Sequence, residues 1–148
     1  MKFEQQSFPV LLRGAWFGLN KAFRRKLETI SITPVQYTVL RNLMEGQGSV
    51  LSQQHLVVAL STSKNNLADL LNRMEEKKLI KRHGSKRDHR NKSVSITQNG
   101  EDEFRRAREH AQALEGEILS CFLPDEQDLL LQYFKRCNDC LEEISGID

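Results

Sequence analysis

The sequence has little that would mark a secreted or membrane protein. Its cysteines are odd in number and lie in the last quarter of the chain: Cys121, Cys137 and Cys140. They form a poor disulfide framework and fit a reducing compartment. No uninterrupted apolar run approaches the roughly 20 residues that span a bilayer. Residues 1–10 contain no basic segment followed by an apolar run, as a signal peptide would. We therefore expect a cytoplasmic protein with no membrane partner, folded as one domain over residues 1–148.

The motifs of common enzymes are also missing. There is no Gly-x-x-x-x-Gly-Lys, His-Glu-x-x-His or Gly-x-Ser-x-Gly pattern. Cys137 and Cys140 have the spacing of a metal or redox pair, but no second ligand pair and no suitably spaced histidine accompany them. We expect no enzymatic activity, no metal and no cofactor, and we interpret Cys137 as a small buried apolar residue. A cysteine-based redox-sensing regulator remains an alternative.

Charge is distributed unevenly along the chain. The segment 77–92 carries eight Lys or Arg residues against one acid, Asp88, a net charge of +7. Residues 101–148 carry thirteen acids against five bases, a net charge of −8. Such a division favours one surface for a polyanion and a different role for the rest. A charged run is commonly just a solvated face, so this feature alone favours nucleic acid only modestly.

Apolar periodicity predicts a helical protein with one short β element. A helical stripe runs from Phe8 to about Leu27, and Thr33-Pro34 is a capping residue with a first-turn proline that starts a second helix. Ser52 caps a short helix, and the Ser61–Ser63 turn leads into another, which together form a helix-turn-helix. Residues 79–82 and 93–97 then alternate as two strands, the hairpin wing of a winged helix.

The C-terminal third returns to helix with two long apolar seams. The first steps by three and four residues from Phe104 to Cys121, and Leu123-Pro124 separates it from a second seam that ends at Ile144. These seams and the N-terminal stripe exceed what a winged helix needs to cover its core. We therefore predict helical dimerisation regions at 1–30 and 98–148 around a DNA-binding region at 31–97. Packing of the helices within one chain is the alternative that we favour less.

The predicted second helix of the helix-turn-helix starts with side chains suited to base recognition. In this motif the first turn meets base edges in the major groove. Asn can pair with adenine, and Ser or Thr can reach bases or phosphates. Capping explains one or two such residues but not five in succession. We predict DNA contacts from the helix at Thr62, Ser63, Lys64, Asn65, Asn66 and Arg73.

The wing loop is too basic for a neutral hairpin connection. Its cations suit phosphates, and an Arg at its tip suits the narrow, electronegative minor groove. The DNA contacts that we predict from the wing are Lys86, Arg87, Arg90 and Lys92. Asp88 stands alone among these cations, so we expect it to pair with an Arg and fix the shape of the wing.

The run from Asp88 to Gly100 resembles the wing signature of the MarR (multiple antibiotic resistance regulator) family, Asp-x-Arg followed by Val-x-Leu-Thr-x-x-Gly. Segments 72–82 and 32–40 are also similar to that family, and the element order matches over nearly the whole chain. The resemblance implies a homodimeric transcription regulator, commonly a repressor, that binds a pseudo-palindromic operator and responds to small aromatic or phenolic ligands. It implies that Arg90 enters the minor groove and that Asp88 holds Arg90 in position. The chain departs from the family at His89, where a second Arg is usual, and at Lys77-Lys78 in place of Lys-Gly.

A ligand site is harder to locate from the sequence. The predicted first helix carries aromatic walls beside a carboxylate-binding cation, at Arg13, Trp16, Phe17 and Asn20. Aromatic residues at helical spacing are more often core. Our hypothesis is a site for a small aromatic acid that weakens DNA binding. A winged helix used only for protein contacts is a further alternative, which salt dependence of binding would distinguish.

Overall fold

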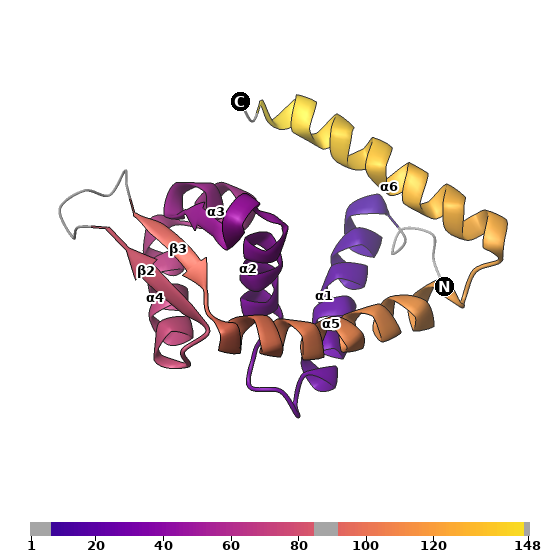
Figure 1. Ribbon diagram of the computed structural model, residues 1–148. Coiled ribbons are helices and arrows are strands. Elements are labelled where there is room, and N and C mark those ends of the chain that lie inside the picture. Colours follow the sequence, from indigo (N-terminus) through magenta and orange to yellow (C-terminus); the bar gives the residue numbers. More distant parts are fainter. Residues whose placement is uncertain (1–6, 85–91, 147–148) are drawn as a thin grey trace. The chain divides into compact units, whose positions relative to one another are not determined.

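The computed structural model describes residues 7–84 and 92–146. The chain divides into two compact units, residues 1–111 and 112–148, and each is described by itself. The first unit contains the helix-turn-helix, the sheet and the start of α5 (Gln98–Leu119) (Figure 1). The finer division into 1–30, 31–97 and 98–148 stays a prediction.

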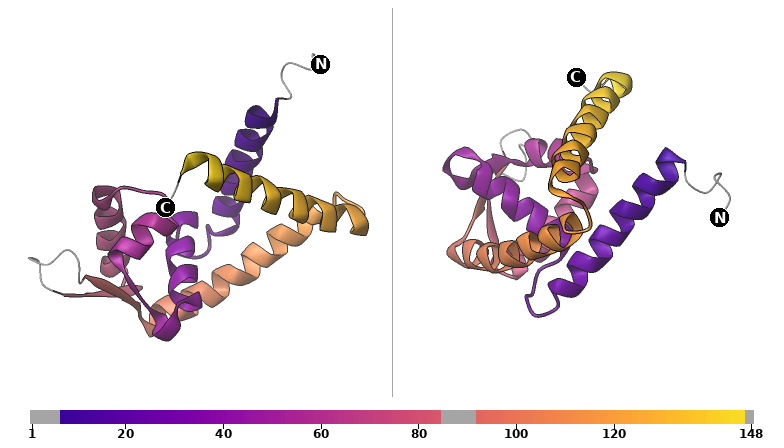
Figure 2. Two further views of the ribbon diagram at one scale, coloured as in Figure 1. Left: turned by 90° about the horizontal axis from the view of Figure 1, so that it is seen from above. Right: turned by 90° about the vertical axis from the view of Figure 1, so that its right-hand side faces the viewer.

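Two N-terminal helices begin where the sequence predicts. Helix α1 spans Phe8–Lys26 and α2 spans Pro34–Glu45. A capping box starts α2: Thr33 Oγ1 accepts the backbone N–H of Gln36 at 3.3 Å, and Gln36 Oε1 accepts that of Thr33 at 3.1 Å. The N-terminal half of α1 extends beyond the rest of the first unit (Figure 2).

Helices α3 (Gln53–Ala59) and α4 (Lys64–Glu76) form the predicted helix-turn-helix. Each begins at a serine whose hydroxyl accepts a backbone N–H three residues later. Ser52 Oγ accepts from His55 at 3.0 Å, and Ser63 Oγ accepts from Asn66 at 3.1 Å. Residues 60–63 make the connection, so the order and start of both helices are confirmed.

The wing belongs to a three-stranded sheet rather than to a simple hairpin. Strands β2 (Ile80–His83) and β3 (Ser93–Ile96) are the predicted pair, each within one residue of its expected bounds. A third strand, β1 (Val50–Ser52), pairs antiparallel with β3, giving the order β1-β3-β2. The sequence analysis missed β1. A 3₁₀ turn, Gln47–Ser49, connects α2 to it.

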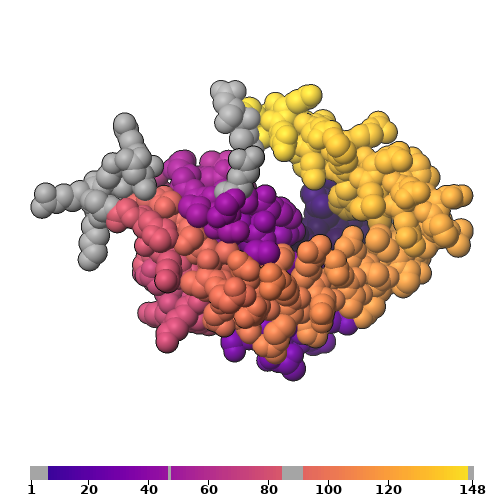
Figure 3. Space-filling model, in the orientation of Figure 1, coloured from indigo at the N-terminus to yellow at the C-terminus, as the bar shows by residue number. Residues whose placement is uncertain are grey.

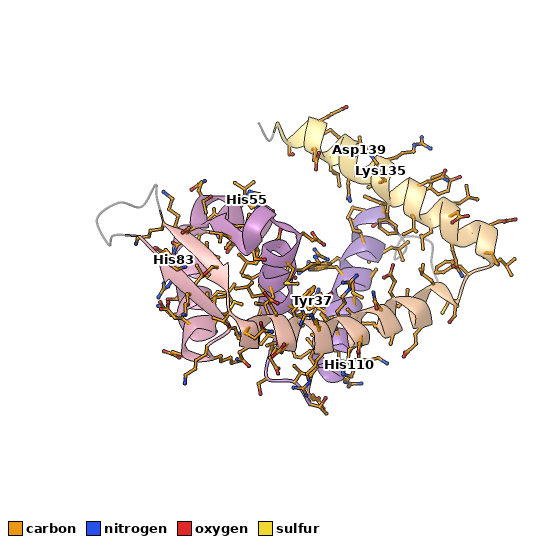
Figure 4. The ribbon with its side chains drawn as sticks, viewed as in Figure 1. Tyr37, His55, His83, His110, Lys135 and Asp139 are labelled. Carbon is orange, nitrogen blue, oxygen red and sulfur yellow. The ribbon has the colours of Figure 1, made fainter. Side chains whose placement is uncertain are left out.

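The core lies between α2, α4, the sheet and the first half of α5 (Gln98–Leu119). Fully buried aliphatic side chains come from α2, α4 and β3, including Leu40, Leu71 and Val94. Tyr37 on α2 joins the elements, since its ring lies 5.1 Å from that of Phe23 and 5.3 Å from that of Phe104 (Figure 4). Phe104 and Ala107 of α5 belong to the same buried cluster, and in the space-filling view the orange surface of α5 borders the purple surface of the first unit (Figure 3). The start of α5 therefore helps to build the first unit.

The structure shows why glycine occupies position 100, the last position of the family signature. A Cβ there would collide with the carbonyl oxygen of Leu79 and come within 2.8 Å of Ile96 Cγ1. The close approach lets α5 pack directly on the residues that follow α4 and on strand β3. A side chain at this position would push α5 away from both.

The second unit consists of the end of α5 and helix α6 (Pro124–Ser145), which starts at the predicted Leu123-Pro124 break. Within the described part of the chain, no helix combines the length and apolarity that crossing a membrane requires.

Candidate nucleic-acid interface

The start of α4 presents polar side chains on one face and core residues on the other. Lys64, Asn65 and Asn66 are exposed, whereas Leu67 and Leu71 are buried against the core. Thr62 and Ser63 precede the helix, half-buried and exposed respectively. The fold therefore brings the five predicted residues of segment 62–66 together at one helix end.

Capping accounts for only one of these five residues. The Ser63 hydroxyl accepts the backbone N–H of Asn66 and so stabilises the helix start. The exposed side chains of Lys64, Asn65 and Asn66 project from the first turn, where the backbone N–H groups and the helix dipole also favour an anion. This arrangement suits both base edges and phosphate oxygens.

Two further predicted residues lie beside this turn or at the foot of the wing. Arg73 is exposed and follows Asn66 by seven residues, which places both on the same side of α4. Lys92 is half-buried, and its carbonyl accepts the backbone N–H of Gln53 at 3.0 Å, which ties the foot of the wing to the start of α3. The other wing predictions, Lys86, Arg87, Asp88 and Arg90, lie outside the described residues.

The residues that follow α4 make hydrogen bonds that the sequence analysis did not predict. Lys77 Nζ donates to the Ser31 carbonyl at 2.7 Å and to Gln36 Oε1 at 3.1 Å, linking the recognition helix to the start of α2. Lys78 adopts a left-handed conformation with φ 59°, which is why glycine suits this position in the family pattern. Thr97 Oγ1 donates to the Lys78 carbonyl at 2.6 Å. Asn99 Nδ2 of α5 donates to the Lys77 carbonyl at 3.2 Å, so α2, α5 and the end of α4 meet at the Lys77-Lys78 pair.

A second connection that the sequence analysis missed joins α4 to β2. Arg82 Nη2 donates to Glu75 Oε1 at 3.0 Å and to Asn72 Oδ1 at 2.5 Å. The side-chain hydrogen bond from Arg82 holds the pKa of Glu75 below its ordinary value of 4.5, against a smaller opposing effect of burial. Glu75 precedes Arg82 by seven residues across a helix-to-strand turn, a spacing with no recognisable sequence signal.

The predicted ligand residues share one helix, and three of the four are exposed. On α1, Arg13, Trp16 and Phe17 are exposed, with 67% of Trp16 and 70% of Phe17 accessible. Asn20 is half-buried and its Nδ2 donates to the Trp16 carbonyl at 2.9 Å. A polar cavity of about 250 Å³ exists elsewhere, lined by Thr29, Ser31, Lys77, Leu79, Asn99, Glu103 and Arg106.

Cys137 is more accessible than the sequence indicates, since it is half-buried in the single chain and α6 has no buried residue. Cys121 and Cys140 are exposed. Over residues 7–84 and 92–146, no group of three His, Cys, Asp or Glu side chains is arranged to hold a metal ion.

Comparison with known proteins agrees with this geometry. Residues 30–91 match the sequence model of the MarR family. The chain is 29% identical over 109 residues to the transcriptional regulator HosA of Escherichia coli O127:H6, an alignment that covers 74% of this chain and 79% of HosA.

Solved structures share the fold at lower sequence identity. S. aureus MepR in complex with DNA superposes with a TM-score of 0.80 at 23% identity, covering 90% of this chain and 98% of MepR. The repressor CouR, bound to a 23-mer DNA duplex, superposes with a TM-score of 0.81 at 22% identity, covering 93% and 98%. CouR bound to p-coumaroyl-CoA gives 0.79 at 21% identity, covering 93% and 96%. Its capped helix α4, its strands β2 and β3 and the matched segment 30–91 make the chain similar to the MarR family.

Proposed function

We propose that this protein is a sequence-specific regulator of transcription that binds double-stranded DNA. The observation that carries the proposal is the start of α4, where Lys64, Asn65 and Asn66 are exposed beside a capped helix end while Leu67 and Leu71 anchor the helix. Such a turn fits the major groove, where Asn pairs with adenine and Lys with guanine or phosphate. No catalytic step is part of the proposal.

The relatives support this assignment. HosA is named a transcriptional regulator, and MepR and CouR carry DNA on the same fold. We assign the DNA contacts to the first turn of α4 with Thr62, Ser63 and Arg73, and to the basic wing with Lys86, Arg87, Arg90 and Lys92, shaped by Asp88. A regulator of this kind must reach the DNA. We therefore propose that the protein is cytoplasmic.

The regulator acts as a homodimer on a pseudo-palindromic operator. Support comes from α1 and α6, which contain no buried residue in the single chain yet carry large apolar side chains such as Phe8, Phe134 and Ile144. Apolar surface of this extent marks an interface. Two copies would present two recognition helices to two half-sites.

The regulator represses its target and is released by a small aromatic or phenolic effector. CouR, a repressor of the same fold, is solved with p-coumaroyl-CoA, which contains a phenolic group. We keep Arg13, Trp16, Phe17 and Asn20 as the candidate effector residues, because their exposed rings and cation fit an aromatic carboxylate. Calorimetry against a panel of aromatic acids tests this assignment, and Arg13→Ala should remove the heat of binding. A panel that gives no heat in any member contradicts it.

DNA binding is tested by fluorescence anisotropy with duplexes taken from upstream of the protein's own gene. Affinity should fall steeply as salt rises, since each phosphate contact releases counterions, and it should resist random competitor. Equal, weak binding to the operator candidates and to random DNA contradicts a sequence-specific regulator. Binding without salt dependence would favour a winged helix that contacts protein.

A further inference from the structure

Three hydrogen bonds tie the first wing strand to the recognition helix through one residue. Besides the two side-chain bonds from Arg82 Nη2, the backbone N–H of Arg82 donates to Glu75 Oε2 at 3.2 Å. Both oxygens of one carboxylate are therefore used, one by the side chain and one by the backbone of the same strand residue. Asn72 and Glu75 are three residues apart and so share a face of α4. We call this set of Arg82, Glu75 and Asn72 the wing clamp.

The wing clamp distinguishes Arg82 from the other cations of the basic segment. Its charge is matched by Glu75 at 3.0 Å, and only 28% of its side chain is accessible. Lys81, the preceding residue, is exposed and points to the opposite face of the strand. An Arg whose guanidinium is engaged by a carboxylate and an amide oxygen has less to offer a phosphate than an exposed Lys.

The wing clamp constrains both strands of the wing. Arg82 pairs with Val94 of β3, so holding Arg82 against α4 also holds the second wing strand. Because β2 and β3 pair along residues 80–83 and 93–96, any change in the angle between β2 and α4 turns both strands together. Hydrogen bonds to bases and phosphates tolerate only a few tenths of an ångström, so DNA contacts are sensitive to that angle.

We infer that Arg82 is a positioning residue for DNA recognition, which through Glu75 and Asn72 fixes the angle between the recognition helix and the wing without touching DNA. The inference rests on the proposed function. The clamp fixes α4, which contacts the major groove, relative to the wing, which contacts the DNA beside it. Removing the clamp therefore weakens binding to a specific site more than binding to random DNA. A partly exposed ion pair contributes only about 1 kcal/mol to folding, so the larger effect is expected in recognition.

The test compares Arg82→Ala with Lys81→Ala, a matched control that removes the same charge from the next residue of the strand. Anisotropy is measured on operator and random duplexes over a salt series, with circular dichroism to confirm folding. Arg82→Ala should lower the operator-to-random affinity ratio about tenfold and leave the salt slope unchanged, whereas Lys81→Ala should leave the ratio unchanged. A slope reduced by about 0.9, with equal weakening on both duplexes, would make Arg82 a phosphate-binding residue and overturn the inference.

Glu75→Ala provides an independent test from the helix side. If Glu75 mattered only through its charge, removing an acid beside DNA would strengthen binding. The clamp requires the opposite, a loss of operator affinity similar to that of Arg82→Ala, and a double variant no weaker than either single one. Unchanged or tighter operator binding by Glu75→Ala would overturn the clamp. Loss of the salt dependence in the unmodified protein would instead refute the proposed function.

Discussion

At the scale of single residues, Lys78 occupies a conformation that L-amino acids avoid. Its φ of 59° lies in the left-handed region, and it follows the last turn of the recognition helix. For a residue with a Cβ this conformation costs roughly 1–2 kcal/mol. The backbone must turn here because Leu79 begins the path into the wing, and its N–H bonds to the Met74 carbonyl at 3.0 Å.

Replacing Lys78 by glycine should stabilise the protein. The relief of left-handed strain exceeds the extra flexibility that glycine gives the unfolded chain, leaving a gain of about 0.5–1 kcal/mol. Thermal denaturation at fixed protein concentration should show a rise of roughly 2–3 °C. Lys78→Ala is the matched control, since it removes the charge but keeps the Cβ, and it should give no such rise. Equal melting temperatures for both variants would mean that strain at this position is negligible.

Glu75 gives a residue-scale prediction about acid. Because its bond from Arg82 lowers its pKa in the folded state, the stabilisation is fully present above the ordinary value of 4.5. It is lost as pH falls through the lowered folded-state pKa. The melting-temperature advantage of the unmodified protein over Glu75→Gln should therefore be constant from pH 7 to about 5 and shrink below 4.5. An advantage that grew on acidification would contradict the ion pair.

At the scale of elements, local signals were predictable from the sequence and long-range ones were not. Thr33, Ser52 and Ser63 start helices through hydrogen bonds to residues three positions away, so short stretches of sequence contain all the information. Strand β1 has only three residues, too few for an alternating pattern, and it exists because Leu51 pairs with Val94 of β3. The wing clamp likewise depends on how β2 emerges from α4. The polar start of α4 was therefore predictable, but its attachment to the wing was not.

Substitutions in the first turn of α4 should distinguish residues that contact bases from residues that contact phosphates. Asn65→Ala and Asn66→Ala should each weaken operator binding by about 1–3 kcal/mol, the usual worth of a specific base pairing by a side chain, and change binding to random DNA little. Lys64→Ala, one residue earlier on the same turn, is the comparison: removing a phosphate-binding charge weakens both duplexes alike and reduces the salt slope by about one. Competition anisotropy on operator and random DNA measures all three. If both Asn variants bind as the unmodified protein does, the first turn of α4 does not face base edges.

At the scale of the whole molecule, charge and apolar surface are assigned to different parts of the chain. The basic segment 77–92 belongs to the recognition helix exit and wing, whereas residues 101–148 are acidic. Helices α5 and α6, which make up most of this acidic segment, would be repelled by DNA. Their apolar seams must therefore make a different contact. Neither α1 nor α6 buries a residue within the single chain, which supports the proposed second copy as the partner of these helices.

Charges placed in the α6 seam should therefore break the dimer and, with it, operator binding. Phe134 and Leu141 are seven residues apart on one side of α6 and are 42% and 45% exposed in the single chain. Phe134→Glu and Leu141→Glu would place carboxylates in an apolar interface, where an unpaired charge is costly. Sedimentation should give a monomer at micromolar concentration, and operator affinity should fall at least tenfold because a monomer occupies only one half-site. Gln132→Glu, at an exposed polar position of the same helix, should remain dimeric. A monomer in the unmodified protein would instead assign these seams to contacts within one chain.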